Sequence, residues 1–137
     1  ALSLAELEEA HRAAGADITL GAFPTSERDR YGALETDSSG HIIRFTAKGQ
    51  LQEGKESFLA SAGVYFGSAD AFRALRVGFE VGTPFSLETD GFPWLLAHQI
   101  NLHAFGSESP FLDIGVPADF ARAPALIATA LDGSAIM

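Results

Sequence analysis

The chain has 137 residues, of which 47% are hydrophobic, and this length suits one domain or a large part of one. The formal net charge of −9 argues against a nucleic-acid surface, which would need a basic stripe. No apolar run approaches the ~20 residues that cross a bilayer, and the absence of cysteine excludes disulfides and thiolate metal sites and favours the cytoplasm.

The first third of the chain predicts a helix, a strand and a hairpin. Ser3 followed by Glu6 is typical of a capping box, and apolar residues at helical spacing from Leu4 end at Gly15. Two further runs joined by Ser38-Ser39-Gly40 predict antiparallel pairing. The predicted strand, the polar loop after it and the two arms of the hairpin cover residues 17–23, 24–30, 31–37 and 41–48.

The remaining two thirds continue the alternation of strand and helix. The segment around Asp113 is predicted to close the sheet, and the Ala-rich tail is predicted as a helix broken at Pro124. The pattern indicates an α/β fold with some antiparallel pairing. The other predicted elements are a mobile polar segment, a buried strand, two helices and a further strand, over residues 51–57, 59–66, 68–75, 86–98 and 101–106.

The segment from Phe111 to Pro117 has the pattern of a strand end, a turn and a helix start. An apolar pair runs into the carboxylate of Asp113, Gly115 turns the backbone, and Pro117 suits a first helical position. This pattern places Asp113 at the end of a strand, where open α/β sheets bind their ligands. Taken alone, the segment favours a simpler interpretation in which Asp113 caps the following helix.

Five segments, in this order and at these distances, resemble the C-terminal half of the sugar-1-phosphate nucleotidyltransferases. Within that family they look most like the D-glycero-D-manno-heptose-1-phosphate guanylyltransferases, and the resemblance runs from about residue 4 to residue 123. It implies a Rossmann-like mixed sheet flanked by helices, of which this chain would supply part. The segments contain Gly32, Lys48-Gly49, Ser61-Ala62-Gly63, Ser86-Leu87-Glu88 and Asp113.

The family's nucleotide-binding signature, a glycine-rich loop with a downstream Arg and Lys, has no match in this chain. We therefore expect residues 1–137 to be the C-terminal, sugar-phosphate-binding half of a domain whose N-terminal nucleotide-binding half is absent. Such a half would leave a strand edge or an apolar face uncovered along residues 17–23. The missing half, or a second copy in a homo-oligomer, would cover it.

The resemblance implies transfer of a nucleotidyl group, GMP from GTP, to a sugar-1-phosphate with release of pyrophosphate. Asp113 would be one of two Mg²⁺ ligands, and Lys48 would bind the phosphate of the sugar-1-phosphate. This chain alone is expected to be inactive, because the second metal ligand would lie in the other half. The simpler interpretations are a helix cap for Asp113 and a solvated strand-end lysine for Lys48.

Four further residues are implied on the sugar side. Gly32 and Gly63 would let the backbone approach the sugar, or would serve a turn and a bulge. Glu88 would accept hydrogen bonds from sugar hydroxyls, or would interact with a helix dipole. Together with Ser61, these residues are expected to line one concavity with Lys48 and Asp113.

Two positions depart from the family's pattern. Ala47 stands where a glutamate usually precedes the lysine, and Ser61 stands where an asparagine usually precedes Ala-Gly. Losing these sugar-contacting groups implies a different sugar or a reduced activity. Three interpretations remain open: half of an active sugar-1-phosphate guanylyltransferase, a catalytically degenerate sugar-phosphate-binding or regulatory subunit, and a structural fragment that only associates with its missing half.

Overall fold

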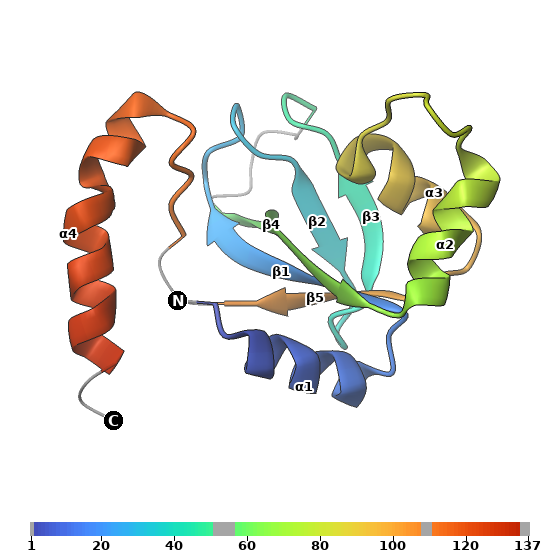
Figure 1. Ribbon diagram of the computed structural model, residues 1–137, viewed down its shortest axis with the longest axis horizontal. Helices are drawn as coiled ribbons and strands as arrows, with labels where there is room; N and C mark the ends of the chain where they lie inside the picture. Colours follow the sequence, from blue (N-terminus) through green and yellow to red (C-terminus); the bar gives the residue numbers. More distant parts are fainter. Residues whose placement is uncertain (1, 51–56, 108–110, 135–137) are drawn as a thin grey trace. The chain divides into compact units, whose positions relative to one another are not determined.

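The computed structural model describes residues 2–50, 57–107 and 111–134. The chain divides into two compact units, Leu2–Ser107 and Glu108–Met137. Figure 1 shows the elements of both units. In chain order, the elements of the first unit are α1 (Leu4–Ala14), β1 (Ile18–Thr25), β2 (Ala33–Thr36), β3 (Ile42–Thr46), β4 (Phe58–Gly67), α2 (Ala69–Gly78), η1 (Leu87–Gly91), α3 (Phe92–Ala97) and β5 (Leu102–Gly106).

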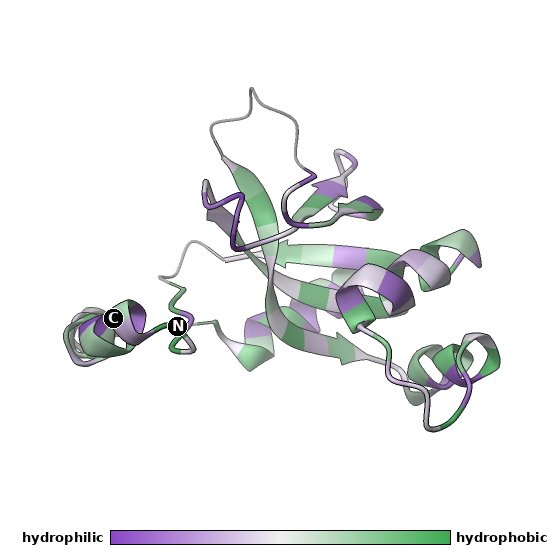
Figure 2. Ribbon diagram, turned by 90° about the horizontal axis from the view of Figure 1, so that it is seen from above, coloured by the Kyte–Doolittle hydropathy of each residue, from purple (hydrophilic) through white to green (hydrophobic). Residues whose placement is uncertain are grey.

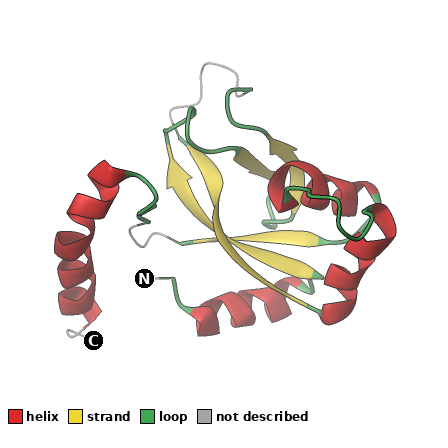
Figure 3. Cartoon of the chain, turned by 45° about the horizontal axis from the view of Figure 1, so that its top comes forward, coloured by secondary structure: helices red, strands yellow, loops and turns green. Residues whose placement is uncertain are grey.

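The five strands form one mixed sheet in the order β3-β2-β4-β1-β5, which confirms the predicted α/β class (Figure 3). β1 lies inside the sheet, antiparallel to β4 and parallel to β5. Its first six residues are all buried, as expected of a strand that is covered on both faces. The expectation of an uncovered strand over residues 17–23 is therefore wrong, because the edges of this sheet are β3 and β5.

The two faces of β1 are covered by different helices. Ile18 and Leu20 point into the main core, where they join the fully buried Phe92 of α3. Thr19 points to the other face, and its hydroxyl is hydrogen-bonded to Nδ1 of His11 in α1 at 3.0 Å. Figure 2 shows the corresponding alternation of hydropathy along the strands. Burial of a side chain as large as Phe92 contributes ~1.5–3 kcal/mol, which anchors α3 and the preceding η1 to the sheet.

The β2–β3 hairpin forms as predicted. Its turn contains Gly40 at a φ of 83°, and the Asp37 carboxylate accepts two backbone N–H bonds within it. The turn also reaches the opposite edge of the sheet, because the Gly40 carbonyl accepts the N–H of Ala104 in β5 at 2.9 Å. His41 forms an isolated antiparallel bridge with His103 beside it. The sheet therefore coils until its two edges meet at this turn.

The helix boundaries follow local signals in the sequence. Ser3 Oγ accepts the Glu6 N–H at 3.3 Å, which confirms the predicted cap, and Gly15 ends α1 in the left-handed conformation. The single helix predicted over residues 86–98 is instead a turn of π-helix, η1, followed by α3. Pro93 lies in the first turn of α3 and has no N–H to donate, so it interrupts the regular helical hydrogen bonding there.

The second unit contains α4 (Pro117–Ser134), and two predictions for this region are wrong. No strand forms over residues 111–113, because the Asp113 carboxylate accepts the Gly115 N–H at 2.9 Å, and this local turn competes with extended pairing. The helix is not broken at Pro124, because proline removes a single N–H and the flanking residues are strong helix formers.

The segment predicted to be mobile, 51–57, lies outside the described residues except at its last position. No helix in the described ranges has the length and apolar character needed to span a membrane.

Candidate functional site

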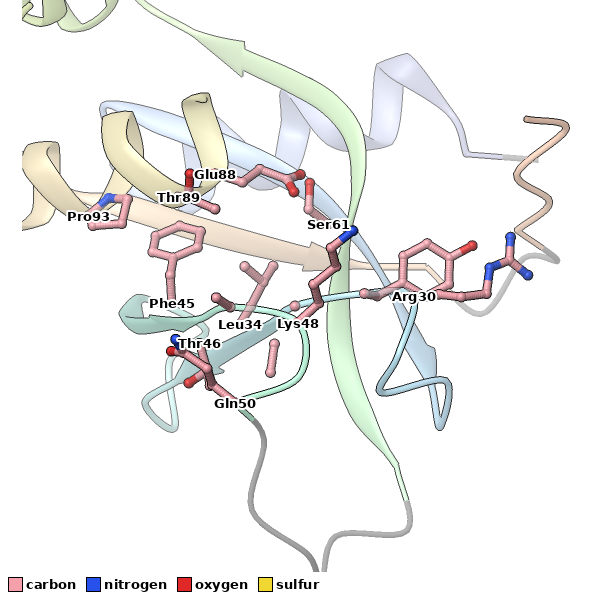
Figure 4. A pocket seen from close by; sticks show the side chains of 14 residues that line it. Arg30, Leu34, Phe45, Thr46, Lys48, Gln50, Ser61, Glu88, Thr89 and Pro93 are labelled. Atoms are coloured by element: carbon pink, nitrogen blue, oxygen red, sulfur yellow. The ribbon is translucent and has the colours of Figure 1, made fainter. Parts of the chain in front are cut away.

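A cavity of about 630 Å³ opens in the first unit where β2, β3 and β4 approach η1 and α3 (Figure 4). This volume is within the range typical of small-molecule pockets, roughly 300–1,000 Å³. Ala47, one of the two departures from the family pattern, is part of its wall. Four of the six predicted site residues also line it: Gly32, Lys48, Ser61 and Glu88.

A lysine just beyond the end of β3 lines this cavity. Lys48 is exposed and lies two residues after the last strand residue, Thr46. In Figure 4 its side chain extends across the cavity toward Ser61. A second cation, Arg30, lines the same cavity and pairs with Glu27 at 2.9 Å. Lys48 therefore brings a positive charge to the cavity of a chain of net charge −9, whereas the charge of Arg30 is paired with that of Glu27.

Gly32 lets the backbones of β2 and β3 approach each other beside Lys48. A Cβ at this position would lie 2.7 Å from the Thr46 carbonyl oxygen and 3.5 Å from the Lys48 nitrogen. The first distance is shorter than side chains tolerate, and the opposing atom is backbone that cannot turn away. Gly32 therefore serves the junction between loop and strand, and it also forms part of the cavity wall.

Gly63 occupies a bulge in β4 and is not among the residues that line the cavity. Between the pairs Leu20↔Tyr65 and Ala22↔Ser61, β4 advances by four residues while β1 advances by two. Gly63 has a φ of 71°, and a Cβ there would meet nothing within 4 Å. Its requirement is therefore conformational, as a bulge demands, and the close approach of its backbone to the sugar stays a prediction.

Glu88 lies in the first turn of η1, and its carboxylate accepts a hydrogen bond from a tyrosine that does not line the cavity. Tyr65 Oη donates to Glu88 Oε1 at 3.2 Å. Burial raises the pKa of the Tyr65 hydroxyl, a hydrogen bond from Ser61 lowers it, and the charge of Glu88 raises it further. Tyr65 therefore keeps its proton at neutral pH. In Figure 4 Glu88 and Ser61 point toward one another.

Tyr65 was not among the residues predicted for the site. The signal that could have found it is a tyrosine two residues after a strand glycine, since a half-buried phenol needs a polar partner. The position of Glu88 could not be foreseen from its sequence neighbourhood, because η1 follows Tyr65 by more than twenty residues.

Asp113 belongs to the second unit, so its predicted convergence with Lys48 stays a prediction. Its side chain is half-buried, and its Oδ1 accepts the Gly115 N–H at 2.9 Å. Across the part of the chain that the structure describes, no three His, Asp or Glu side chains form a group that could hold a metal ion.

The model of the family described as "Nucleotidyl transferase" matches residues 2–130. The D-glycero-alpha-D-manno-heptose 1-phosphate guanylyltransferase of Aneurinibacillus thermoaerophilus is 32% identical over 122 residues, which cover 89% of this chain and 49% of that protein. The mannose-1-phosphate guanylyltransferase of Mycobacterium tuberculosis is 29% identical over 123 residues, covering 89% of this chain and 32% of that protein. The chain thus spans about half, or less, of the length of these relatives.

Among solved structures, HddC from Yersinia pseudotuberculosis superposes with a TM-score of 0.66 and 23% identity, covering 89% of this chain and 48% of that chain. HddC in complex with GMP-PN gives a TM-score of 0.63 and 22% identity over the same shares of the two chains. At these identities the likeness concerns the fold, and it agrees with the predicted mixed sheet flanked by helices.

Proposed function

The chain belongs to the nucleotidyl transferase family, and on that premise we propose that it supplies the sugar-phosphate side of a sugar-1-phosphate nucleotidyltransferase. In the proposed reaction, a phosphate oxygen of the sugar-1-phosphate attacks the α-phosphorus of a nucleoside triphosphate, and pyrophosphate leaves. The names of the two guanylyltransferase relatives favour GTP and therefore a GDP-sugar product. The nucleotide would be bound by a part of the protein outside residues 1–137.

The observation that carries this proposal is the cavity itself. Gly32, Lys48, Ser61 and Glu88 come from separate segments, yet all four line one cavity. Lys48 brings a point charge suited to phosphate, whereas Glu88 and Ser61 bring oxygens suited to sugar hydroxyls. Nucleotidyl transfer depends on positioning two anions and on neutralising their charge, and this wall offers both functions.

Asp113 is proposed as a Mg²⁺ ligand. Its carboxylate is the kind of hard oxygen donor that Mg²⁺ takes, usually as one or two carboxylates with phosphate oxygens and waters. One oxygen accepts the Gly115 N–H, which holds the side chain in a defined orientation. When bound, Mg²⁺ would neutralise charge on the phosphates. The second carboxylate would come from the nucleotide-binding part.

A second candidate function is sugar-phosphate binding without catalysis. Ala47 favours it, because this residue lines the cavity and leaves its wall without the carboxylate that the family pattern has beside the lysine. A polar sugar that loses a hydrogen-bonding group in its site is bound and oriented less well.

The test uses the protein expressed from its full natural coding sequence, with pyrophosphate release from GTP measured against a panel of sugar-1-phosphates. Lys48→Ala should raise the KM for the sugar-1-phosphate at least about tenfold and leave the KM for GTP within about twofold, because the loss of a charge-assisted phosphate contact costs ~1.5–3 kcal/mol. Arg12→Ala is the matched control, because it removes an exposed cation of α1 that pairs with Glu8.

Equal KM values in the Lys48→Ala variant and the parent would contradict the assignment of Lys48. Calorimetric binding of a sugar-1-phosphate without pyrophosphate release from any member of the panel would favour the second candidate function.

A further inference from the structure

A hydrogen bond from outside the cavity wall ends on Glu88. Tyr65 Oη donates to Glu88 Oε1 at 3.2 Å, and Tyr65 is not among the residues that line the cavity. Tyr65 lies in β4, two residues after Gly63, whose N–H donates to Ser61 Oγ at 3.2 Å. The same strand therefore carries the donor to Glu88 and the hydroxyl of Ser61, toward which Glu88 points in Figure 4.

This hydrogen bond leaves Glu88 as an acceptor toward a ligand. The phenol has one proton, and it is donated to Glu88. A carboxylate offers about four lone-pair positions on its two oxygens, and Tyr65 occupies one of them. Glu88 lines the cavity, so its remaining lone pairs are available to a ligand there.

The ring of Tyr65 fixes where its hydroxyl can lie. It packs edge-on against Phe92, with ring centroids 5.0 Å apart, and Phe92 is fully buried. Glu88 is exposed and its side chain has three rotatable bonds, so a fixed phenol holds the carboxylate better than solvent does. Burial keeps Tyr65 protonated by raising its pKa, so the donor is present at neutral pH.

We propose that Tyr65 is a positioning residue that holds Glu88 as a hydrogen-bond acceptor, so that the cavity selects sugar phosphates by a hydroxyl proton that they donate. This inference rests on the proposed function. It adds the device that sets sugar recognition, and it involves a side chain that touches no ligand itself.

The hydrogen bond can be tested without any ligand by titrating Tyr65. Its NMR signal is assigned by its disappearance in Tyr65→Phe, and the pKa of the phenol is followed in the parent and in Glu88→Ala. Because the charge of Glu88 and its hydrogen bond with Tyr65 both raise this pKa, the pKa should fall in Glu88→Ala. An unchanged pKa in that variant overturns the inference, whatever the activity of the enzyme.

Its role toward the ligand is tested on the protein expressed from its full natural coding sequence, with mannose-1-phosphate and its single-deoxy analogues as probes. Tyr65→Phe keeps the ring and should raise the KM for the sugar phosphate roughly five- to tenfold, with kcat and the KM for GTP changed less than about twofold. Tyr65→Phe/Glu88→Ala should bind within about twofold of Glu88→Ala alone, because Tyr65 acts through Glu88.

The matched control is Thr19→Val, which also removes one hydrogen-bonded hydroxyl from the sheet but lies on the face toward α1. It should leave the KM for mannose-1-phosphate unchanged. The parent should discriminate against at least one deoxy analogue, and Glu88→Ala should not.

An unchanged KM in Tyr65→Phe, or effects of Tyr65→Phe and Glu88→Ala that simply add, overturns the positioning role. If the Tyr65 titration behaves as expected but no sugar phosphate binds, the hydrogen bond between Tyr65 and Glu88 stands, whereas the proposed function and the recognition role built on it both fail.

Discussion

Ala47 and Lys48 are neighbours in the cavity wall but differ in what they bring to it. Lys48 supplies a charge. Ala47 leaves space at the position where the family pattern has a carboxylate. A carboxylate beside Lys48 would accept hydrogen bonds from sugar hydroxyls, and it would also pair with the lysine ammonium. Under the proposed function, this pair would bind the phosphate and leave the sugar hydroxyls to Ser61 and Glu88.

Restoring the acid at this position should change the sugar preference. We expect Ala47→Glu to raise kcat/KM by about tenfold or more for at least one sugar-1-phosphate in the panel, which corresponds to ~1.4 kcal/mol. Ala13→Glu adds the same charge on the exposed face of α1 and serves as the control. An unchanged profile across the panel would mean that the space at Ala47 has no role in choosing the sugar.

Substituting Asp113 distinguishes a role as a metal ligand from a role in a local turn alone. If it holds Mg²⁺, Asp113→Ala should lower turnover by several orders of magnitude, while the loss of its hydrogen bond to Gly115 costs at most ~1 kcal/mol of stability. Turnover and urea unfolding are measured on the same preparation. Asp70→Ala, which removes an exposed carboxylate paired with Arg73 in α2, should leave turnover unchanged. Turnover of Asp113→Ala at the parent rate would leave Asp113 with the turn alone.

At the scale of elements, local chemistry predicted most boundaries. Ser3 and Gly15 delimit α1, and the alternation around Ser38-Ser39-Gly40 specified the β2–β3 hairpin. The predictions that failed concern helices in which a proline and its neighbours favour different structures. Pro93 converts the start of a helix into η1 and α3, whereas Pro124 is accommodated within α4 because its neighbours favour the helix.

The candidate site was predictable as a set of residues but not as a mechanism of positioning. Resemblance named Lys48, Ser61 and Glu88, all of which reach the cavity. It could not show that Tyr65 donates to Glu88, because that contact depends on the bulge at Gly63, and the number of extra residues in a bulge is set by pairing with β1.

The bulge in β4 should be sensitive to its glycine. Gly63→Ala places a Cβ at a φ of 71° and should lower the free energy of unfolding by ~1–2 kcal/mol. Gly63→Asn should lose less, because asparagine tolerates this conformation better. Urea unfolding measures both variants. Equal losses for alanine and asparagine would argue against backbone strain as the cause.

At the scale of the whole first unit, the sheet edges meet at His41 and His103, with Asp37 and His11 close by. The Nδ1 of His103 is buried and has no hydrogen-bond partner in the described residues. Burial lowers the pKa of His103, and the charge of His41 lowers it further. Below the ordinary value of about 6.5, the unfolded chain therefore binds more protons than the native one.

Stability should accordingly fall as the pH is lowered through about 6.5 toward the native pKa of His103, by at most ~1.4 kcal/mol for each pH unit. His103→Gln should show a smaller loss between pH 7.5 and 5.5 in urea unfolding. The lowered pKa of Asp37 acts in a separate window, because its contribution is present above about 3.8 and is lost only in stronger acid. An identical pH dependence of parent and variant would show that His103 titrates normally.

The parallel pairing of β1 with β5 also determines when the first unit can finish folding during synthesis. Asp17, just before β1, accepts the N–H of Asn101, which lies 84 residues later at the start of β5. At about 5–20 residues per second, the ribosome needs roughly 4–17 s to make that stretch. Until then one edge of the most buried strand has no partner. A nascent chain stalled before β5 should therefore be captured by chaperones far more readily than one stalled well beyond it.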